Sequence, residues 1–292
     1  MLGEMTKAAE LQAVLVEKSK SVLGDRHPET LREMNTLAWS YYNLGQLKEA
    51  EEIQLLVVDE SRKILGETNQ LTLHHLGNLA SIYRAQGRKT EAYELDVRVL
   101  SERTNQLGTQ HPDSIRAQNE LALTYHALGR VVDAKNLQFE VLEKQGNILG
   151  KDHPGTLNTM GELALSYRDL RQFREAEELE VSVLEKRRKV LGENHPLTSL
   201  AIGNLAMTYN KLEKYRAAEI LEVELLEKQR NLLGYSHPMT LLCMQNLAWT
   251  YRHMGHIREA EELQAVLKKE RNLPCDDDGG VNTLVDIRVV YR

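Results

Sequence analysis

Apolar residues recur along this chain in one pattern, which returns every 42 residues without an insertion or deletion. In the first half of the pattern Leu37, Ala38 and Tyr41 stand at i, i+1 and i+4, a spacing that places them on one face of a helix. The second half predicts another helix over about residues 48–64. Its expected inward positions are Ala50, Ile53, Val57, Val58 and Leu65. Each period therefore encodes a pair of amphipathic helices.

Two columns of the pattern hold the same residue in every copy. Alanine occupies one of them seven times, at Ala8, Ala50, Ala92, Ala134, Ala176, Ala218 and Ala260. Tyrosine occupies the other six times, at Tyr41, Tyr83, Tyr125, Tyr167, Tyr209 and Tyr251. A small residue lets a neighbouring helix approach, and a register kept this strictly indicates a stacked repeat array. The predicted fold is all-α: a right-handed α-solenoid of stacked helix–turn–helix repeats.

Start and stop signals flank both helices of the pair. His-Pro precedes the first helix in five of six copies, as at His27, and proline suits the first helical position. A hydroxyl such as Thr30 follows, and we expect it to bond back to the free N-terminal end of the helix backbone. Gly45 and its equivalents end the first helix as left-handed caps. Arg171 and Glu213 replace that glycine in two copies, which predicts tighter or more strained turns there.

The register also predicts the domain organisation. Residues 1–24 correspond to a half repeat containing only a second helix, because Met1-Leu2-Gly3 aligns with the end of a first helix, Asn43-Leu44-Gly45. Six 42-residue repeats then occupy residues 25–271, and an irregular tail follows at 272–292, where Cys275-Asp276 replaces the expected Leu-Gly. An open start in register favours a truncated, split or mis-predicted form of a longer protein.

Composition excludes several classes of partner. A net charge of −6 and a pI near 6.0 argue against nucleic acid, which needs a basic surface. Two cysteines make no disulfide framework and fit a reducing compartment. No apolar run approaches the ~20 residues of a membrane span, and a signal peptide is not evident. We therefore expect a cytoplasmic protein without membrane insertion.

No catalytic motif stands out in the sequence. The phosphate loop G-x-x-x-x-G-K-[ST], the G-x-S-x-G elbow and H-E-x-x-H are all missing from it. Five of the ten histidines belong to the His-Pro column, so they are spaced one per repeat instead of converging on a metal. The sequence therefore predicts no enzyme activity, no cofactor and no metal site.

The L-A-x-x-Y motif, followed nine residues later by alanine, resembles the tetratricopeptide signature lengthened from about 34 residues. The fuller pattern, HPxTL…NLAxxY…GR…EAEEL…VLExR…LG, is similar to the 42-residue repeats of kinesin light chains. It looks closer still to the repeat tails of fungal signalling ATPases of the STAND or NOD-like type, to which Glu175–Val181 points. One column departs from the family, because polar residues replace an aromatic at Gln54, Asp96, Gln138, Glu180, Glu222 and Gln264.

The resemblance implies that the first helices line a concave groove and that their outward positions select a peptide. The candidate groove residues are Asn78, Asn204, Asn246, Trp39, Trp249, Arg84, Arg116, Arg168 and Arg252. A carboxamide donates and accepts, so asparagine suits the backbone of an extended peptide. The arginines and tryptophans suit a partly acidic peptide with bulky anchors, although Glu120 and Glu162 equally favour a basic residue at its centre.

Two functions fit these observations. The first is a non-catalytic protein–protein interaction scaffold that binds an extended peptide or partner domain in the concave groove. The second is the ligand-sensing repeat region of a STAND-type signalling ATPase that lacks its nucleotide-binding domain. Self-association through the uncapped N-terminal end is a further expectation.

Overall fold

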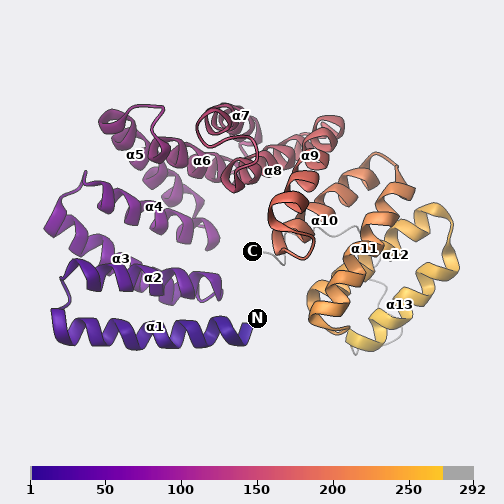
Figure 1. Cartoon of the computed structure of the whole chain (residues 1–292), viewed down its shortest axis with the longest axis horizontal. Coiled ribbons are helices and arrows are strands. Elements are labelled where there is room, and N and C mark those ends of the chain that lie inside the picture. The colour runs from indigo at the N-terminus through magenta and orange to yellow at the C-terminus, as the bar shows by residue number, and fades with distance from the viewer. Residues whose placement is uncertain (1, 272–292) are drawn as a thin grey trace. The chain divides into compact units, whose positions relative to one another are not determined.

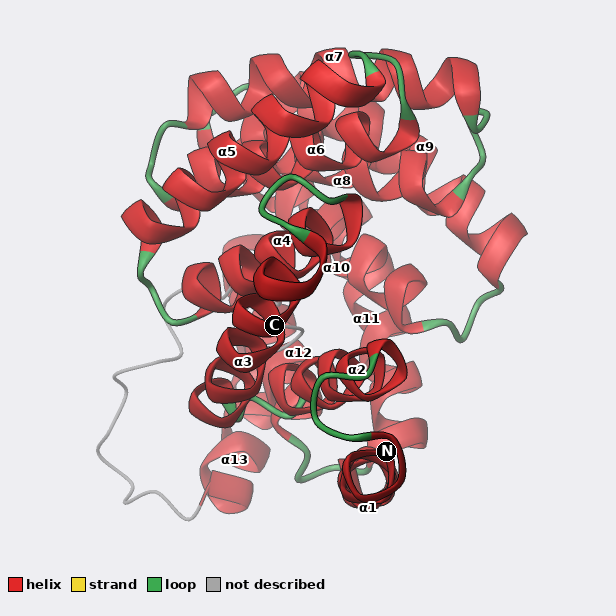
Figure 2. Ribbon diagram, turned by 90° about the vertical axis from the view of Figure 1, so that its left-hand side faces the viewer, coloured by secondary structure: helices red, strands yellow, loops and turns green. Residues whose placement is uncertain are grey.

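The computed structural model describes residues 2–271, which form thirteen α-helices and no strand (Figures 1 and 2). The first seven are α1 (Leu2–Leu23), α2 (Pro28–Asn43), α3 (Leu47–Leu65), α4 (Gln70–Ala85), α5 (Lys89–Leu107), α6 (Pro112–Ala127) and α7 (Val131–Ile148). The others are α8 (Pro154–Asp169), α9 (Phe173–Leu191), α10 (Pro196–Lys211), α11 (Tyr215–Leu233), α12 (Pro238–Met254) and α13 (Ile257–Arg271). Consecutive helices pack in pairs, so the predicted all-α solenoid is confirmed. The predicted tail at 272–292 lies outside the described residues.

The chain divides into two compact units, and the boundary between Lys144 and Gln145 falls inside α7. Unit 1 contains α1 to α6, and unit 2 contains α8 to α13. Residues 2–23 form the single helix α1, and the division into a half repeat over residues 1–24 and six repeats over residues 25–271 stays a prediction.

Histidine caps the first helices as expected. In each of the five His-Pro copies the ring Nδ1 accepts a hydrogen bond from the backbone N–H two residues on, at 3.1–3.2 Å. Asn69 caps α4 in the same way at 2.9 Å. The expected role of the hydroxyl is wrong: Thr30 donates to the Gly24 carbonyl at 2.8 Å, and Thr198 to that of Gly192. In these copies the hydroxyl ties the first helix to the glycine carbonyl that follows the preceding helix, whereas Thr72 donates to the Ser61 carbonyl at 3.3 Å and Ser114 Oγ has no hydrogen-bond partner.

Arg171 and Glu213 adopt the left-handed conformation that glycine holds elsewhere, with φ of 59° and 60°. The hydrogen bond that closes the turn is unchanged, at 2.9 Å from Gln172 N–H to the Tyr167 carbonyl and from Gln46 N–H to the Tyr41 carbonyl. The two turns are therefore not tighter, but side chains at positive φ carry backbone strain.

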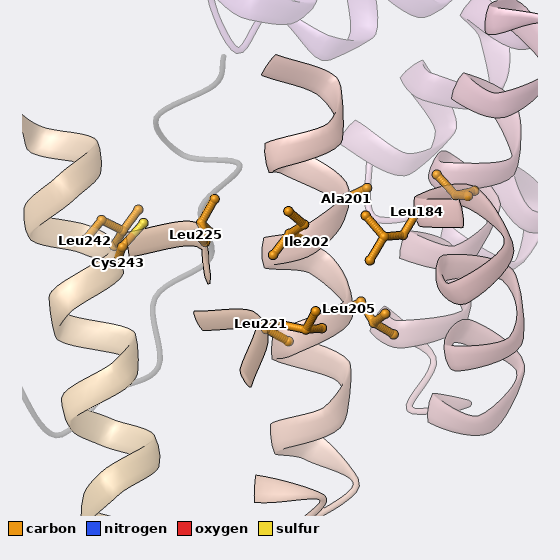
Figure 3. Close-up of a cluster of buried hydrophobic side chains, with 10 residues drawn as sticks. Leu184, Ala201, Ile202, Leu205, Leu221, Leu225, Leu242 and Cys243 are labelled. Carbon is orange, nitrogen blue, oxygen red and sulfur yellow. The ribbon is translucent and has the colours of Figure 1, made fainter. Parts of the chain in front are cut away.

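Each unit has an apolar core between successive helices. In unit 1, Val58 and Val99 pack with Leu73, Leu76 and Leu79 of α4. In unit 2, Ala201, Ile202 and Leu205 of α10 lie between Leu184 of α9 and residues of α11 and α12 (Figure 3). One predicted core position is wrong, since Leu65 is exposed; it is the last residue of α3, where no following turn covers it.

Candidate functional site

The candidate groove residues all lie on first helices, and within unit 1 these helices touch one another. α4 contacts both α2 and α6 as well as its own second helix. Trp39 belongs to α2, Asn78 and Arg84 to α4, and Arg116 to α6. In unit 2 the candidates are Arg168 of α8, Asn204 of α10, and three residues of α12, namely Asn246, Trp249 and Arg252.

Arg84 does not point outward. Its Nη1 donates to Thr124 Oγ1 of α6 at 2.8 Å and lies 3.5 Å from Asp96 Oδ2 of α5. Its Nη2 donates to Glu120 Oε2 at 2.7 Å. Thr124 Oγ1 in turn donates to Asp96 Oδ2 at 2.6 Å. One arginine therefore joins its own second helix to the next first helix.

The same arrangement recurs in unit 2. Arg168 Nη1 lies 3.3 Å from Glu180 Oε1 and donates to the Asn204 carbonyl at 3.1 Å. Arg252 Nη2 donates to Gln264 Oε1 at 2.7 Å. We call this set the polar ladder: the residues of the Arg84 column, those of the Asp96 column, and the hydroxyls equivalent to Thr124.

The expectation that Arg84, Arg168 and Arg252 face a ligand is therefore corrected. Their guanidinium groups are turned into the array, and Arg168 is fully buried. The sequence contained a signal for this inward orientation. Asp96 and Glu180, which belong to the polar column that departs from the family pattern, are the partners of Arg84 and Arg168. A buried arginine needs such partners, but the pairing only becomes visible when the helices are placed.

In repeat five of the ladder an amide replaces the cation. Asn210 Nδ2 donates to Glu222 Oε1 and to Thr250 Oγ1, both at 2.9 Å. Burial raises the pKa of Glu222 to about 8, although hydrogen bonds from Thr250 and Asn210 oppose the shift. Burial likewise raises the pKa of Asp96 to about 6, with the Thr124 bond and the Arg84 charge opposing it.

The three candidate asparagines have different environments. Asn78 Nδ2 donates to Asn35 Oδ1 of the preceding repeat at 2.9 Å. The Asn204 side chain is half-buried, and its Oδ1 atom is buried without a hydrogen-bond partner. Asn246 is buried, so its predicted outward position is corrected: it lies in α12, which is buried along almost its whole length.

The tryptophans form two aromatic stacks, one in each unit. Trp39 is 42 % exposed and stacks on Tyr42, with ring centroids 4.7 Å apart and an interplanar angle of 12°. Trp249 stacks on His253 at 3.6 Å, and the Tyr215 ring lies 6.3 Å from Trp249. Arg116 is exposed and pairs with Asp113 Oδ1 at 2.7 Å. These residues remain accessible to a ligand.

A second buried polar column was not predicted. Arg187 Nη1 donates to the Leu197 carbonyl at 3.0 Å and its Nη2 to Asn158 Oδ1 at 2.9 Å. Arg103 occupies the equivalent position in unit 1 and donates to the Asp113 carbonyl at 3.3 Å. Burial lowers the pKa of both guanidinium groups. The sequence contained a signal for this column, because Arg103 and Arg187 occupy the same position of the 42-residue repeat.

The described part of the chain offers little reactive chemistry. Over residues 2–271 no three His, Cys, Asp or Glu side chains are grouped so as to hold a metal ion. The Cys243 thiol is buried, and burial raises its pKa to about 12, which makes it a poor nucleophile. Among the described helices, none combines the length and apolarity needed to span a membrane.

Comparison with solved structures shows similar arrays. A kinesin light chain-like protein of Podosopora anserina with nearly identical TPR-like repeats is 31% identical, with a TM-score of 0.62 over 68% of this chain and 94% of that one. BtubC (BKLC) from P. vanneervenii is 21% identical, with a TM-score of 0.67 over 77% and 91%. A STAND protein with a tetratricopeptide repeat sensor from Pyrococcus horikoshii is 17% identical, with a TM-score of 0.66 over 92% of this chain and 41% of that one.

Sequence models of the tetratricopeptide repeat match most of the chain. One matches residues 30–70, 156–197, 198–238 and 240–269, and a second matches residues 69–145. No curated protein sequence is significantly similar to the chain. The repeat matches and the similarity to the Podosopora anserina protein together show that the chain belongs to the tetratricopeptide repeat family, with relatives of the kinesin light chain-like type.

Proposed function

We propose that the chain is a non-catalytic scaffold that binds an extended peptide, or an extended segment of a partner domain, on the exposed faces of its first helices. Tetratricopeptide repeats generally mediate protein–protein interactions. The observation that carries the proposal is the Trp39–Tyr42 stack, because 42 % of a tryptophan is left in solvent on a first helix. Exposed, rigid aromatic side chains are the commonest anchors of protein interfaces.

The proposed contact surface is narrower than the sequence predicted. In unit 1 it comprises Trp39, Asn78 and Arg116, and in unit 2 it comprises Asn204 and Trp249. Asn204 suits a peptide backbone because its carboxamide can donate and accept hydrogen bonds and the residue is only half-buried. Arg84, Arg168 and Arg252 act behind this surface, since their bonds hold the first helices that carry it. Asn246 is buried beneath it.

Selection of peptides from a displayed random library by the purified chain tests this function. We expect the selected peptides to lose at least about tenfold in affinity for Trp39→Ala or Trp249→Ala, as for interface hot spots. Tyr235→Ala is the matched control, because Tyr235 is an exposed aromatic in the α11–α12 loop. Circular dichroism checks that each variant is folded. A library that yields no binder, or binders indifferent to both tryptophans, contradicts the proposal.

A second candidate function is that of a sensor region in a STAND-type ATPase. It is supported by the fold shared with the repeat sensor of the Pyrococcus horikoshii STAND protein. On this proposal the same surface binds a ligand and controls a nucleotide-binding domain. A phosphate loop encoded upstream and in frame with Leu2 would favour it. For both functions we propose a cytoplasmic location, which imaging of a tagged chain tests.

A further inference from the structure

An apolar cleft opens in unit 1 between the second helices α3 and α5. It encloses a cavity of about 740 Å³. Leu55 and Leu56 of α3 line the cavity together with Leu95 of α5, and Leu79 and Tyr83 of α4 line it from between these two helices. Leu79 is buried in the apolar core of unit 1. The cleft therefore reaches from the surface down to that core.

Two neighbouring leucines of α3 are left in solvent at this cleft. Leu55 is 42 % exposed and Leu56 is 55 % exposed. Apart from Val14 and Val266, the other second helices carry polar residues at the position of Leu56, namely Arg98, Glu140, Ser182 and Glu224. The repeats therefore pack without a leucine at this position. Exposed apolar side chains grouped in a hollow mark an interaction site.

Three charged residues line the cleft, and two of them already have a partner of opposite charge. Asp59 forms an ion pair with Lys63, and Arg62 Nε lies 3.2 Å from Glu67 Oε1. Glu52 is exposed and stands one turn before the two leucines. Among the described residues, no basic side chain pairs with its carboxylate. The cleft is therefore apolar, with one unbalanced negative charge beside the leucines.

The shape and chemistry of the cleft favour a helix as its occupant. Its apolar part consists of side chains from three helices, whose backbone groups are bonded within those helices. An extended peptide would leave its N–H and C=O groups unpaired against leucine, whereas a helix bonds its own backbone. The lining residues of α3, from Glu52 to Arg62, extend about 15 Å along its axis, at about 1.5 Å per residue. This length matches about three turns of an incoming helix.

We propose that the α3–α5 cleft is a docking site for an amphipathic helix of a partner protein, with leucine-type side chains on one face and a lysine or arginine beside them. The apolar face covers Leu55 and Leu56 and enters the hollow above Leu79. The basic side chain pairs with Glu52. Burial of apolar surface drives the association. The cleft goes beyond the peptide-binding function proposed above, since none of the residues that line it belongs to the contact surface of Trp39 and Trp249.

Selection from a displayed library of alanine-rich helices, about 18 residues long and randomised on one face, tests the proposal with the full chain. We expect the enriched helices to carry leucine-type residues at helical spacing with a flanking lysine or arginine. Leu56→Ser should weaken their binding at least about tenfold in fluorescence anisotropy, because an apolar anchor is lost. Serine stands at this position in α9, as Ser182, so the variant keeps the packing of the repeat. Ile220→Ser is the matched control, since Ile220 is an exposed aliphatic residue of α11.

Glu52→Gln tests the expected charge of the partner. We expect it to weaken the enriched helices about two- to fivefold at low salt, as for an exposed ion pair. The difference should disappear at high salt, because salt screens exposed charges. Glu178→Gln is the control, since Glu178 is the exposed equivalent of Glu52 on α9 in unit 2.

Four results would overturn the proposal. Two are a library that yields no helix and helices that bind the Leu56→Ser variant as well as the unaltered chain. The third is enrichment of acidic helices indifferent to Glu52→Gln, which would contradict the proposed partner. The fourth is a concentration-dependent dimer that Leu56→Ser abolishes while no helix binds, which would assign the cleft to a second copy. Trp39→Ala should leave helix binding unchanged, so failure here is distinguishable from failure of the peptide-binding function.

Discussion

Replacing Glu222 by Gln tests whether the polar ladder holds a proton at its fifth repeat. Glu222 accepts a hydrogen bond from Asn210, whereas the equivalent Glu180 faces Arg168. The Oε2 atom of Glu222 is buried without a hydrogen-bond partner. Burial raises its pKa to about 8, so the folded chain carries a neutral carboxyl at pH 7. Glutamine has nearly the same shape and already stands at this position in other repeats, as at Gln54 and Gln264.

The magnitude follows from proton linkage. The unfolded chain releases the Glu222 proton near pH 4.5, and the folded chain releases it near pH 8. Between these values unfolding releases a proton, so this group's contribution to stability is present at low pH and is lost as pH rises. From pH 5 to pH 8 the contribution falls by about 3.5 kcal/mol, at 1.36 kcal/mol for each pKa unit. The Glu222→Gln variant should not show this fall.

Urea unfolding at pH 5, 6, 7 and 8 measures the effect. Trp249 of α12 reports on unit 2 when Trp39 is replaced by Phe, and groups such as Asp96 cancel in the difference between the variant and its parent. We expect the Gln variant to gain about 3.5 kcal/mol over its parent between pH 5 and pH 8. Glu180→Gln is the control: it deprives buried Arg168 of its carboxylate and should destabilise by about 3–5 kcal/mol at pH 7. Parallel curves for Glu222→Gln and its parent would refute a buried neutral carboxyl.

Three further predictions concern stability. Arg171→Gly and Glu213→Gly should each raise the free energy of unfolding by about 0.5–1 kcal/mol, because glycine removes the strain of positive φ at some cost in chain entropy; a lower melting temperature in both would contradict this. His195→Ala should cost about 0.5–2 kcal/mol in urea unfolding through loss of the α10 cap, with His195→Asn retaining most of it. Asn246→Ala should lower the melting temperature by the equivalent of about 1–3 kcal/mol, because the substitution removes a buried polar side chain and its hydrogen bonds. An unchanged melting temperature would indicate that Asn246 lies on the surface.

The predicted helices and their caps were largely right because their causes are local. The His27 ring caps the amide two residues away, and glycine at the turn supplies a left-handed residue wherever it stands. The Thr30 prediction failed because its partner, the Gly24 carbonyl, lies beyond the helix that Thr30 belongs to. The candidate site was predicted less well, since exposure depends on neighbours in the next repeat. Trp39 is exposed, but Arg84 reaches Glu120, 36 positions away.

The sequence by itself determined the helix pairs, the register of the repeats and the family, because a strict 42-residue period of apolar, small and capping residues specifies short-range structure. Only the tertiary structure decided which polar residues face solvent. An arginine side chain is long enough to point outward or to cross to the adjacent helix, and the buried carboxylates at Asp96 and Glu180 settle that choice.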